Sequence, residues 1–242
     1  MYGSNYYDEN AFFEAFQKRR DRPESPNNAI EGPALISMLD GVDGKSVLDL
    51  GCGTGDFGAE LFQIGAVNYH GVDGSERMIE AARVKLKDTN AKLWQGHLEE
   101  IQIQESVYDL IVSRLAFHYL KDVKPLFKKV YLALPLNGRL VFSVQHPVLT
   151  ASMKSTGEGK RTDWIVDDYF HSGERIEPWI NQENVRKYHR TVEQYVTALL
   201  EAGFQLEGLK EGTPERRYFE SDEEYERRLR IPLVLVLSAT KR

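Results

Sequence analysis

The chain has 242 residues, enough for one domain with insertions. Its net charge of −6 argues against a surface that binds nucleic acid through the phosphate backbone. No apolar run approaches the roughly 20 residues of a membrane span, and the first residues lack the basic and apolar parts of a signal peptide. The single cysteine, Cys52, excludes an intrachain disulfide and is typical of a cytoplasmic protein.

Three basic pairs have acidic neighbours or lie on a polar helix face, and we interpret them as solvated surface. They are Lys128-Lys129, Arg216-Arg217 and Arg227-Arg228. The six histidines are scattered without the spacing of a metal site, so no metal is expected.

Two helices are predicted before the first strand. The first covers residues 8–20 and places three phenylalanines on one stripe, and the second covers residues 29–39 after a loop with two prolines. Because both precede the sheet, we interpret residues 1–44 as an added cap. Tyr6, Tyr7 and Asn28 in this cap are candidate substrate contacts.

From Ser46 onward, strands and helices alternate, which is typical of a parallel α/β sheet. The predicted strands are 46–50, 68–72, 91–95, 108–113, 138–144, 204–210 and 233–239. The predicted helices are 56–64, one that begins at the N-cap Ser75, 122–133 and 192–202, with a further partly helical stretch at 222–229. No internal repeat interrupts this order.

Residues 145–190 match neither a strand nor a helix pattern and are rich in aromatic residues, histidine and aspartate. They follow the strand 138–144 directly, at the edge where open α/β sheets bind ligands, so we interpret them as a substrate lid. Its candidate catalytic residues are His146 and His189, and its candidate substrate contacts are Trp164, Asp168, Tyr169, Arg175 and Arg190. A buried polar cluster of Asp168, Arg175, His189 and Arg190 is one expectation. The alternative is that the aromatic residues pack inside the lid and the charges pair on its surface.

A glycine turn joins the first strand to the first helix of the sheet. Gly51, Gly53 and Gly55 occupy alternate positions, and the helix begins at Asp56. This arrangement brings backbone N–H groups up to a ligand. A dinucleotide fingerprint would place glycine at the position of Asp56, where a carboxylate opposes a pyrophosphate. An NAD-dependent oxidoreductase is therefore the weaker of two interpretations.

The run Leu48-Asp49-Leu50-Gly51-Cys52-Gly53-Thr54-Gly55 resembles motif I of the class I S-adenosylmethionine-dependent methyltransferases. The resemblance implies an α/β Rossmann-like sheet of seven strands in the order 3-2-1-4-5-7-6, with strand 7 antiparallel and helices on both faces. Together with the cap and the lid, it leads us to expect a single domain over residues 1–242, with the cap at 1–44, a cofactor-binding core at 45–144, the lid at 145–190 and a C-terminal helix and two strands at 191–242. The cofactor would be S-adenosylmethionine and the product S-adenosylhomocysteine.

The same resemblance implies roles for individual residues. Asp73, 22 residues after Gly51, would accept hydrogen bonds from both ribose hydroxyls, and Gly74 and Met78 would line the adenine. His97 stands where the family usually has an acid that binds the adenine amino group, so that contact would come from Leu98 or Glu99. The complete expected cofactor set is Asp49, Gly51, Cys52, Gly53, Thr54, Gly55, Asp73, Gly74, Met78, His97, Leu98, Glu99, Ser113 and Arg114.

The run from Ser113 to Tyr119 is similar to that of methyltransferases that act on small molecules. It contains His118, a third candidate base, with packing under the cofactor as the alternative. The Asp-Pro-Pro-Tyr motif of enzymes that methylate amino nitrogens of nucleic acid and glutamine is absent, and so is the Pro-Cys nucleophile of pyrimidine carbon methylation. The sequence thus predicts an enzyme that methylates a small molecule. The alternative is a non-catalytic protein that binds the cofactor, or its product, and acts through a partner.

Overall fold

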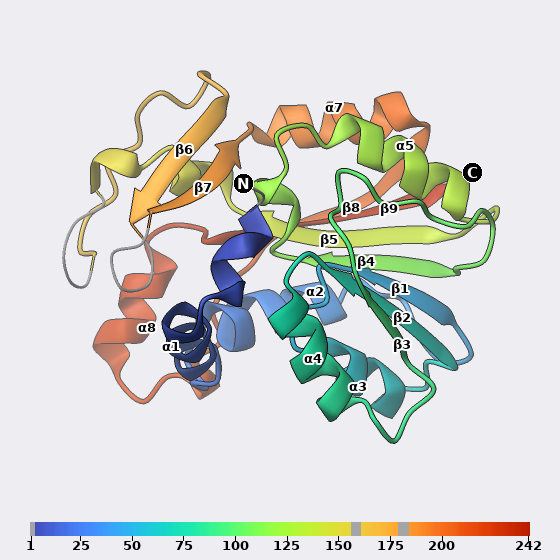
Figure 1. Cartoon of the computed structure of the whole chain (residues 1–242). Coiled ribbons are helices and arrows are strands. Elements are labelled where there is room, and N and C mark those ends of the chain that lie inside the picture. Colours follow the sequence, from blue (N-terminus) through green and yellow to red (C-terminus); the bar gives the residue numbers. More distant parts are fainter. Residues whose placement is uncertain (1–2, 156–160, 179–183) are drawn as a thin grey trace.

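The computed structural model describes residues 3–155, 161–178 and 184–242. Its main sheet has seven strands in the order β3-β2-β1-β4-β5-β9-β8 (Figure 1). Five are parallel: β1 (Ser46–Leu50), β2 (Asn68–Asp73), β3 (Lys92–Gln95), β4 (Leu110–Arg114) and β5 (Arg139–Gln145). Between β5 and β8 (Phe204–Glu211) lies β9 (Val234–Lys241), antiparallel to both. The predicted strand order and the antiparallel last strand are confirmed.

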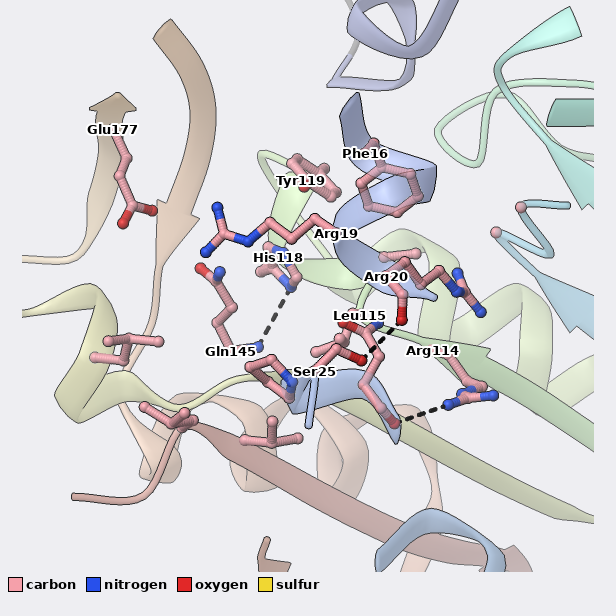
Figure 2. A pocket seen from close by; sticks show the side chains of 18 of the residues that line it. Phe16, Arg19, Arg20, Ser25, Arg114, Leu115, His118, Tyr119, Gln145 and Glu177 are labelled. Carbon is pink, nitrogen blue, oxygen red and sulfur yellow. Dashed lines mark hydrogen bonds between the residues drawn. The ribbon is translucent and has the colours of Figure 1, made fainter. Parts of the chain in front are cut away.

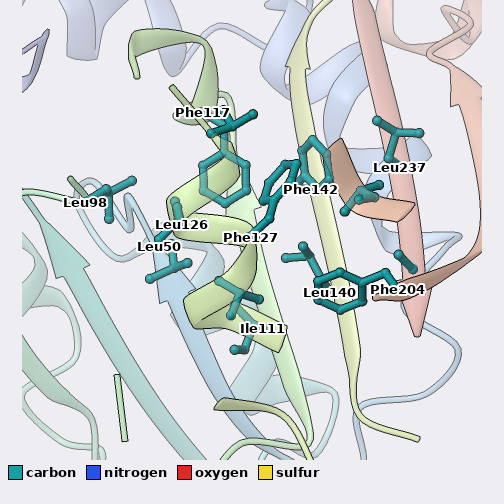
Figure 3. Packing of buried hydrophobic residues seen from close by; sticks show 14 of the residues in the cluster. Leu50, Leu98, Ile111, Phe117, Leu126, Phe127, Leu140, Phe142, Phe204 and Leu237 are labelled. Carbon is teal, nitrogen blue, oxygen red and sulfur yellow. The ribbon is translucent and has the colours of Figure 1, made fainter. Parts of the chain in front are cut away.

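Helices cover both faces of this sheet. On one face lie α5 (Lys124–Ala133) and α7 (Val192–Ala202), and on the other lie α2 (Gly32–Ile36), α3 (Asp56–Gln63) and α4 (Glu76–Lys85) (Figure 1). Side chains of β5 alternate between the two cores: Leu140 and Phe142 pack with Phe127 of α5, whereas Val141 points to the opposite core (Figure 3). Because both faces are buried, the strands are apolar along nearly their whole length. None of the helices in the described segments combines the length and the apolar character that crossing a bilayer requires.

The cap contains a 3₁₀ turn (Gly3–Asp8), helix α1 (Asn10–Arg20) and a π-helical turn (Asn27–Glu31) that leads into α2. The second cap helix is therefore shorter than the predicted 29–39. Pro33 has no N–H group to bond to Ala29, so the α-helical ladder cannot run through this point. The Gly32 amide instead bonds to the carbonyl of Asn27.

The lid forms a helical turn, α6 (Pro147–Thr150), and a two-stranded antiparallel sheet of β6 (Gly173–Pro178) and β7 (Asn184–His189). The sequence did not predict these strands. The buried positions of β7 alternate correctly, but two of the three are Lys187 and His189, so the strand lacks an apolar period. Parts of the expected cap and lid, residues 1–2, 156–160 and 179–183, lie outside the described residues.

The polar segment before β9 forms the predicted helix α8 (Asp222–Leu229). In Figure 1, α1, α8 and the β6–β7 hairpin gather beyond the same end of the main sheet, where β4 and β5 end. Three segments far apart in the sequence thus surround the carboxyl edge of the parallel strands.

Candidate functional site

The carboxyl ends of the parallel strands open into a cavity of about 1420 Å³. Gly51, Gly53 and Asp73 line it from the ends of β1 and β2, and Arg114 and Gln145 line it from the ends of β4 and β5. Side chains from α1, β6 and α8 form the opposite walls. The cavity therefore lies where the sequence predicted a ligand, between the sheet, the cap and the lid.

The glycine turn leaves its backbone accessible from the cavity. Gly51 and Gly53 have φ angles of +87° and +54°, a region that side chains disfavour. A Cβ atom on Gly51 would lie 2.5 Å from Cβ of Ala116, so no other residue fits there. Beside Gly53, by contrast, the nearest described atom to such a Cβ is Nη1 of Arg20, at 3.7 Å. The turn thus presents open space at Gly53 and a guanidinium next to it.

Asp73 connects this turn to the start of α4. Its Oδ2 accepts a hydrogen bond from the Gly53 amide and its Oδ1 accepts one from the Ser75 amide, each at 2.9 Å. Burial raises the pKa of Asp73, and the two backbone hydrogen bonds oppose that shift. A carboxylate oxygen has two lone-pair directions, so each oxygen can accept one further hydrogen bond. The arrangement suits a pair of hydroxyl donors in the cavity.

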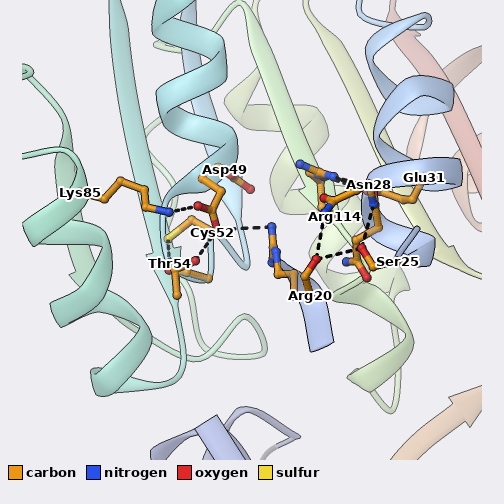
Figure 4. Close-up of polar contacts among 12 residues, drawn as sticks. Arg20, Ser25, Asn28, Glu31, Asp49, Cys52, Thr54, Lys85 and Arg114 are labelled. Carbon is orange, nitrogen blue, oxygen red and sulfur yellow. Dashed lines mark hydrogen bonds and ion pairs between the residues drawn. The ribbon is translucent and has the colours of Figure 1, made fainter. Parts of the chain in front are cut away.

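Asp49 does not line the cavity, because its side chain lies beneath the turn (Figure 4). Its Oδ2 accepts a hydrogen bond of 2.8 Å from the Tyr69 hydroxyl, whereas its buried Oδ1 has no hydrogen-bond partner among the described residues. Burial is the main reason that the pKa of Asp49 is raised to about 7. The site therefore has a carboxyl group behind its floor that is readily protonated.

Four other members of the expected cofactor set also lie outside the cavity wall: Cys52, Thr54, Gly55 and Ser113. Thr54 Oγ1 donates to Asp56 Oδ2 at 2.5 Å, and Ser113 Oγ donates to the Leu50 carbonyl at 2.7 Å. These side chains hold the turn and the strand ends in place. The members that do line the cavity are Gly51, Gly53, Asp73, Gly74, Met78, His97, Leu98, Glu99 and Arg114.

Arg114 is held by the cap. Its Nη2 lies 2.5 Å from Oε2 of Glu31, a fully buried carboxylate that also accepts a hydrogen bond of 2.6 Å from Ser143 Oγ (Figure 4). The guanidinium also stacks on Phe57, 4.6 Å from the ring centre. Arg114 therefore fastens the π-helical turn to the sheet, and its charge is already compensated.

Arg20 is a cavity residue that the sequence analysis missed. It ends α1, and its Nη2 lies 3.8 Å from Oδ2 of Asp56 (Figure 4). Burial and then the nearby Arg114 charge lower the pKa of Arg20. The run Lys18-Arg19-Arg20 is visible in the sequence, but its proximity to the glycine turn depends on how the cap docks.

The start of the cap is attached across the cavity. The Tyr7 hydroxyl lies 3.1 Å from that of Tyr119, and burial raises the pKa of Tyr7 to about 12. The next residue, Asp8, accepts hydrogen bonds from Ser75 Oγ at 2.6 Å and from the Arg77 amide at 3.3 Å. Tyr7 lines the cavity as expected of a ligand contact, whereas Tyr6 packs near Phe12 outside it.

His118 is the candidate base that lines the cavity (Figure 2). Its Nδ1 accepts a hydrogen bond of 3.4 Å from the backbone N–H of Gln145. Burial, with Lys187 and Arg190 nearby, lowers the pKa of His118 well below its usual value. The ring is therefore neutral near pH 7, and because Nδ1 is an acceptor, Nε2 carries the proton. His118 can donate a hydrogen bond from Nε2, and it has no free basic nitrogen.

The other two candidate bases lie away from the cavity. His146 is the N-cap of α6: its Nδ1 accepts from the Val148 amide at 3.1 Å, and its Nε2 lies 3.0 Å from Glu211 Oε1. In His189, Nδ1 lies 2.6 Å from Thr150 Oγ1, and Nε2 lies 2.8 Å from the carbonyl of Tyr169. Both rings hold the lid together in this structure.

The buried polar cluster expected in the lid is wrong. Asp168 is exposed and contacts His171, 3.0 Å away, and Arg175 donates to the His171 carbonyl at 2.6 Å. Arg190 lies elsewhere, with its guanidinium 5.8 Å from the Tyr195 ring centre. Asp168 and Arg175 do meet, since Arg175 Nη2 also donates to the Asp168 carbonyl at 3.4 Å, but Asp168 is exposed and the four side chains form no buried cluster.

Of the remaining expected substrate contacts, Trp164 lines the cavity and Tyr169 and Asn28 do not. Tyr169 packs edge-on against His189, with 5.6 Å between ring centres. Asn28 Nδ2 donates to the carbonyls of Arg20 and Arg22, at 2.9 and 3.0 Å, and so shapes the loop after α1.

The interpretation of Arg227 and Arg228 as solvated surface is also wrong. Both line the cavity, and their side chains are 14% and 15% exposed. The pair lies on a helix whose other residues are four carboxylates, Tyr225 and Leu229, so its few apolar residues do not mark the two arginines as buried. In the described part of the chain, no group of three or more His, Cys, Asp or Glu side chains is placed to hold a metal ion.

Comparison with known proteins agrees with this geometry. A family described as a methyltransferase domain matches residues 47–138. The structure of an S-adenosylmethionine dependent methyltransferase from Mesorhizobium loti superposes with a TM-score of 0.79 and 36% identity, covering 87% of this chain and 97% of that one. A structure proposed to be such an enzyme, from Listeria monocytogenes, has a TM-score of 0.79 and 37% identity, covering 88% and 96%. An uncharacterized protein of Haemophilus influenzae is 33% identical over 85% of each chain.

Proposed function

The chain belongs to the class I S-adenosylmethionine-dependent methyltransferases, and from that premise we propose that it transfers the cofactor's methyl group to a small-molecule acceptor. The observation that carries the proposal is the continuous cavity that joins the glycine turn and Asp73 to Trp164 and His118. Its volume of about 1420 Å³ exceeds the roughly 300–1,000 Å³ of a site for one drug-sized ligand. There is room for a nucleoside cofactor and for a second molecule.

The residues at the turn suit this cofactor. Asp73 offers acceptor positions for two ribose hydroxyls while its existing bonds hold it in place. The open space at Gly53, beside the Arg20 guanidinium, suits the amino-acid part of the cofactor, with its carboxylate toward Arg20. Gly74, Met78, His97, Leu98 and Glu99 form the wall on which the adenine would lie.

When bound, the cofactor supplies a sulfonium whose methyl group is a strong electrophile. The protein's contribution is to hold the acceptor atom in line with that methyl and to exclude water. His118 donates from Nε2 and is suited to orient an oxygen or nitrogen of the acceptor. We infer that the neutral ring does not act as the base, and that the acceptor atom reacts without proton removal by His118.

Two alternatives remain distinguishable. A non-catalytic protein that acts through a partner would bind the cofactor product equally well, but it would not need the cavity to extend beyond the cofactor. An NAD-dependent enzyme is disfavoured because Asp56 sits in the first turn of α3, where a pyrophosphate would approach.

The experiment has two stages. Calorimetric titration should show binding of S-adenosylhomocysteine and none of NAD; the reverse result would refute the cofactor assignment. Incubation with methyl-labelled S-adenosylmethionine and a fractionated metabolite extract should then transfer label to a small molecule. Cofactor binding without transfer to any fraction would favour the non-catalytic alternative.

A further inference from the structure

The part of the cavity away from the glycine turn has an unusual charge arrangement. Arg161, Arg227 and Arg228 line it, although their side chains are at most 18% exposed. Figure 2 shows Arg19 reaching from α1 toward the side of the cavity where Gln145 and Glu177 lie. Three segments distant in the sequence thus bring cations to one space.

The carboxylates in contact with these cations are shared. Glu224 lies 2.5 Å from Nη2 of Arg227 and 2.9 Å from Nε of Arg228, and the second contact lacks the alignment of a hydrogen bond. Glu177 lies 2.8 Å from Nζ of Lys187 and 3.6 Å from Nη2 of Arg161. Four cations therefore share two carboxylates in these contacts. Two further carboxylates line the described cavity wall nearby: Glu220 is exposed, and Glu24 contacts Arg22.

These cations lie close enough to affect one another. Burial and then the Arg227 charge lower the pKa of Arg228 to about 10. Burial, opposed by Glu177, lowers the pKa of Arg161, and Arg227 lowers it further. Partly buried like charges repel strongly because little water screens them, and an anion placed among them relieves that repulsion.

From this juxtaposition, and resting on the proposed function, we propose that the acceptor is a small organic dianion, a phosphomonoester or a dicarboxylate, held by Arg161, Arg227 and Arg228. Arginine forks bind carboxylate and phosphate oxygens in pairs, which fixes the orientation of the anion. The wall also carries apolar side chains, among them Leu149, Phe219 and Leu233. The acceptor therefore combines a doubly charged group with an apolar body, and the charged group anchors the molecule while another atom faces the methyl donor.

The test uses the full chain saturated with S-adenosylhomocysteine, so that no turnover occurs. Phenyl phosphate and phthalate are titrated calorimetrically, with benzamide as a neutral compound of similar shape. We expect at least one anion to bind tenfold or more tightly than benzamide, and which one binds distinguishes phosphate from dicarboxylate. Equal binding of all three compounds, or no binding of either anion, would overturn the proposal. Failure of S-adenosylhomocysteine to bind would instead refute the proposed function.

Single substitutions distinguish a specific anion-binding site from a general effect of the protein's positive charges. R227Q and R228Q should each weaken anion binding at least tenfold, with unchanged affinity for S-adenosylhomocysteine. R217Q is the matched control, since Arg217 is 70% exposed and lies outside the cavity wall; an equal loss in R217Q would overturn the proposal. E224Q removes the shared carboxylate and should tighten anion binding severalfold. Weaker or unchanged binding in folded E224Q would also overturn it, so the test does not depend on the arginine variants folding.

Discussion

Oδ2 of Asp73 accepts the Gly53 amide hydrogen across 2.9 Å, so the ends of β1 and β2 are joined by a side chain that also faces the cavity. This bond makes the two residues one unit: the turn at Gly53 positions the carboxylate, and the carboxylate fixes the turn. Changes at either residue should therefore affect cofactor binding before they affect anything else.

D73A should weaken S-adenosylhomocysteine binding at least tenfold, about 1.4 kcal/mol. The substitution removes the hydroxyl acceptors and leaves the Gly53 amide without its partner. Calorimetry measures the effect, and D88A, which removes an exposed carboxylate beyond the end of α4, is the control. Wild-type affinity in D73A would contradict the ribose assignment.

G53V should abolish binding of S-adenosylhomocysteine, because a branched side chain would enter the cavity at the turn. The backbone at Gly53 also disfavours any side chain. G41V supplies the control for that strain, since Gly41 has φ +79° and no described atom within 4 Å of a Cβ placed there. If G53V bound as tightly as G41V, the cofactor would not approach this turn.

R20Q should weaken S-adenosylhomocysteine binding about tenfold or more while leaving 5′-methylthioadenosine binding unchanged. The second compound lacks the amino acid, so it has no carboxylate to meet the guanidinium, and a charge-assisted contact of this kind contributes roughly 1.5–3 kcal/mol. The pair of ligands tests the role of Arg20 directly in calorimetric titrations. Equal losses for both ligands would indicate a structural role for Arg20.

Asp49 should make the protein less stable as pH rises from about 4 to about 7. Burial raises its pKa to about 7, so the folded chain retains a proton that the unfolded chain releases in this range. The free energy of unfolding therefore falls as pH increases through the window. D49N cannot ionise and keeps an acceptor for Tyr69, so at pH 8 it should be more stable than wild type, by up to about 4 kcal/mol.

Denaturant unfolding at pH 5 and pH 8 measures this difference. The advantage of D49N should be larger at pH 8 than at pH 5. The same advantage at both pH values would show that Asp49 has an ordinary pKa in the folded chain.

His118 should stay neutral, with its proton on Nε2, at pH values where an ordinary histidine is already charged. Burial lowers its pKa, so protonation disfavours the folded state and its contribution to stability falls only as pH drops below about 6.5. Nitrogen-15 NMR of histidine-labelled protein distinguishes the two tautomers and the charged ring. A His118 signal that titrates near pH 6.5, or a proton on Nδ1, would contradict the donor role.

The sheet could be predicted because local residue preferences, the apolar pattern and the turn residues all favour the same fold there. The apolar strands and the glycine turn each have a residue-level cause, and the structure contains both. The predicted helix 192–202 likewise begins where Thr191 and Gln194 form a capping box. The same holds for Asp73, whose position at the end of β2 follows from the alternation of elements.

The part of the cavity that we propose to hold the acceptor could not be predicted by the same reasoning. Lys187 and His189 face inward from β7, and Arg228 faces inward from a helix with six charged residues. The spacing of apolar residues therefore does not reveal the buried face of either element. Arg20 meets the glycine turn through the docking of the cap, which no sequence spacing encodes. His146 after β5 and His189 at the end of β7 have the right position along the chain, yet Nδ1 of each ring bonds to the lid itself.

The attachment of Tyr7 to Tyr119 and of Asp8 to Ser75 has a kinetic consequence. The 3₁₀ turn lines the cavity with Tyr7, and α1 lines it with Arg20 beside the glycine turn. We therefore expect the exchange of spent cofactor for fresh to require these bonds to break and re-form in every cycle. Any fusion or truncation that loosens this segment should therefore change the turnover rate even when the affinity for the acceptor is untouched.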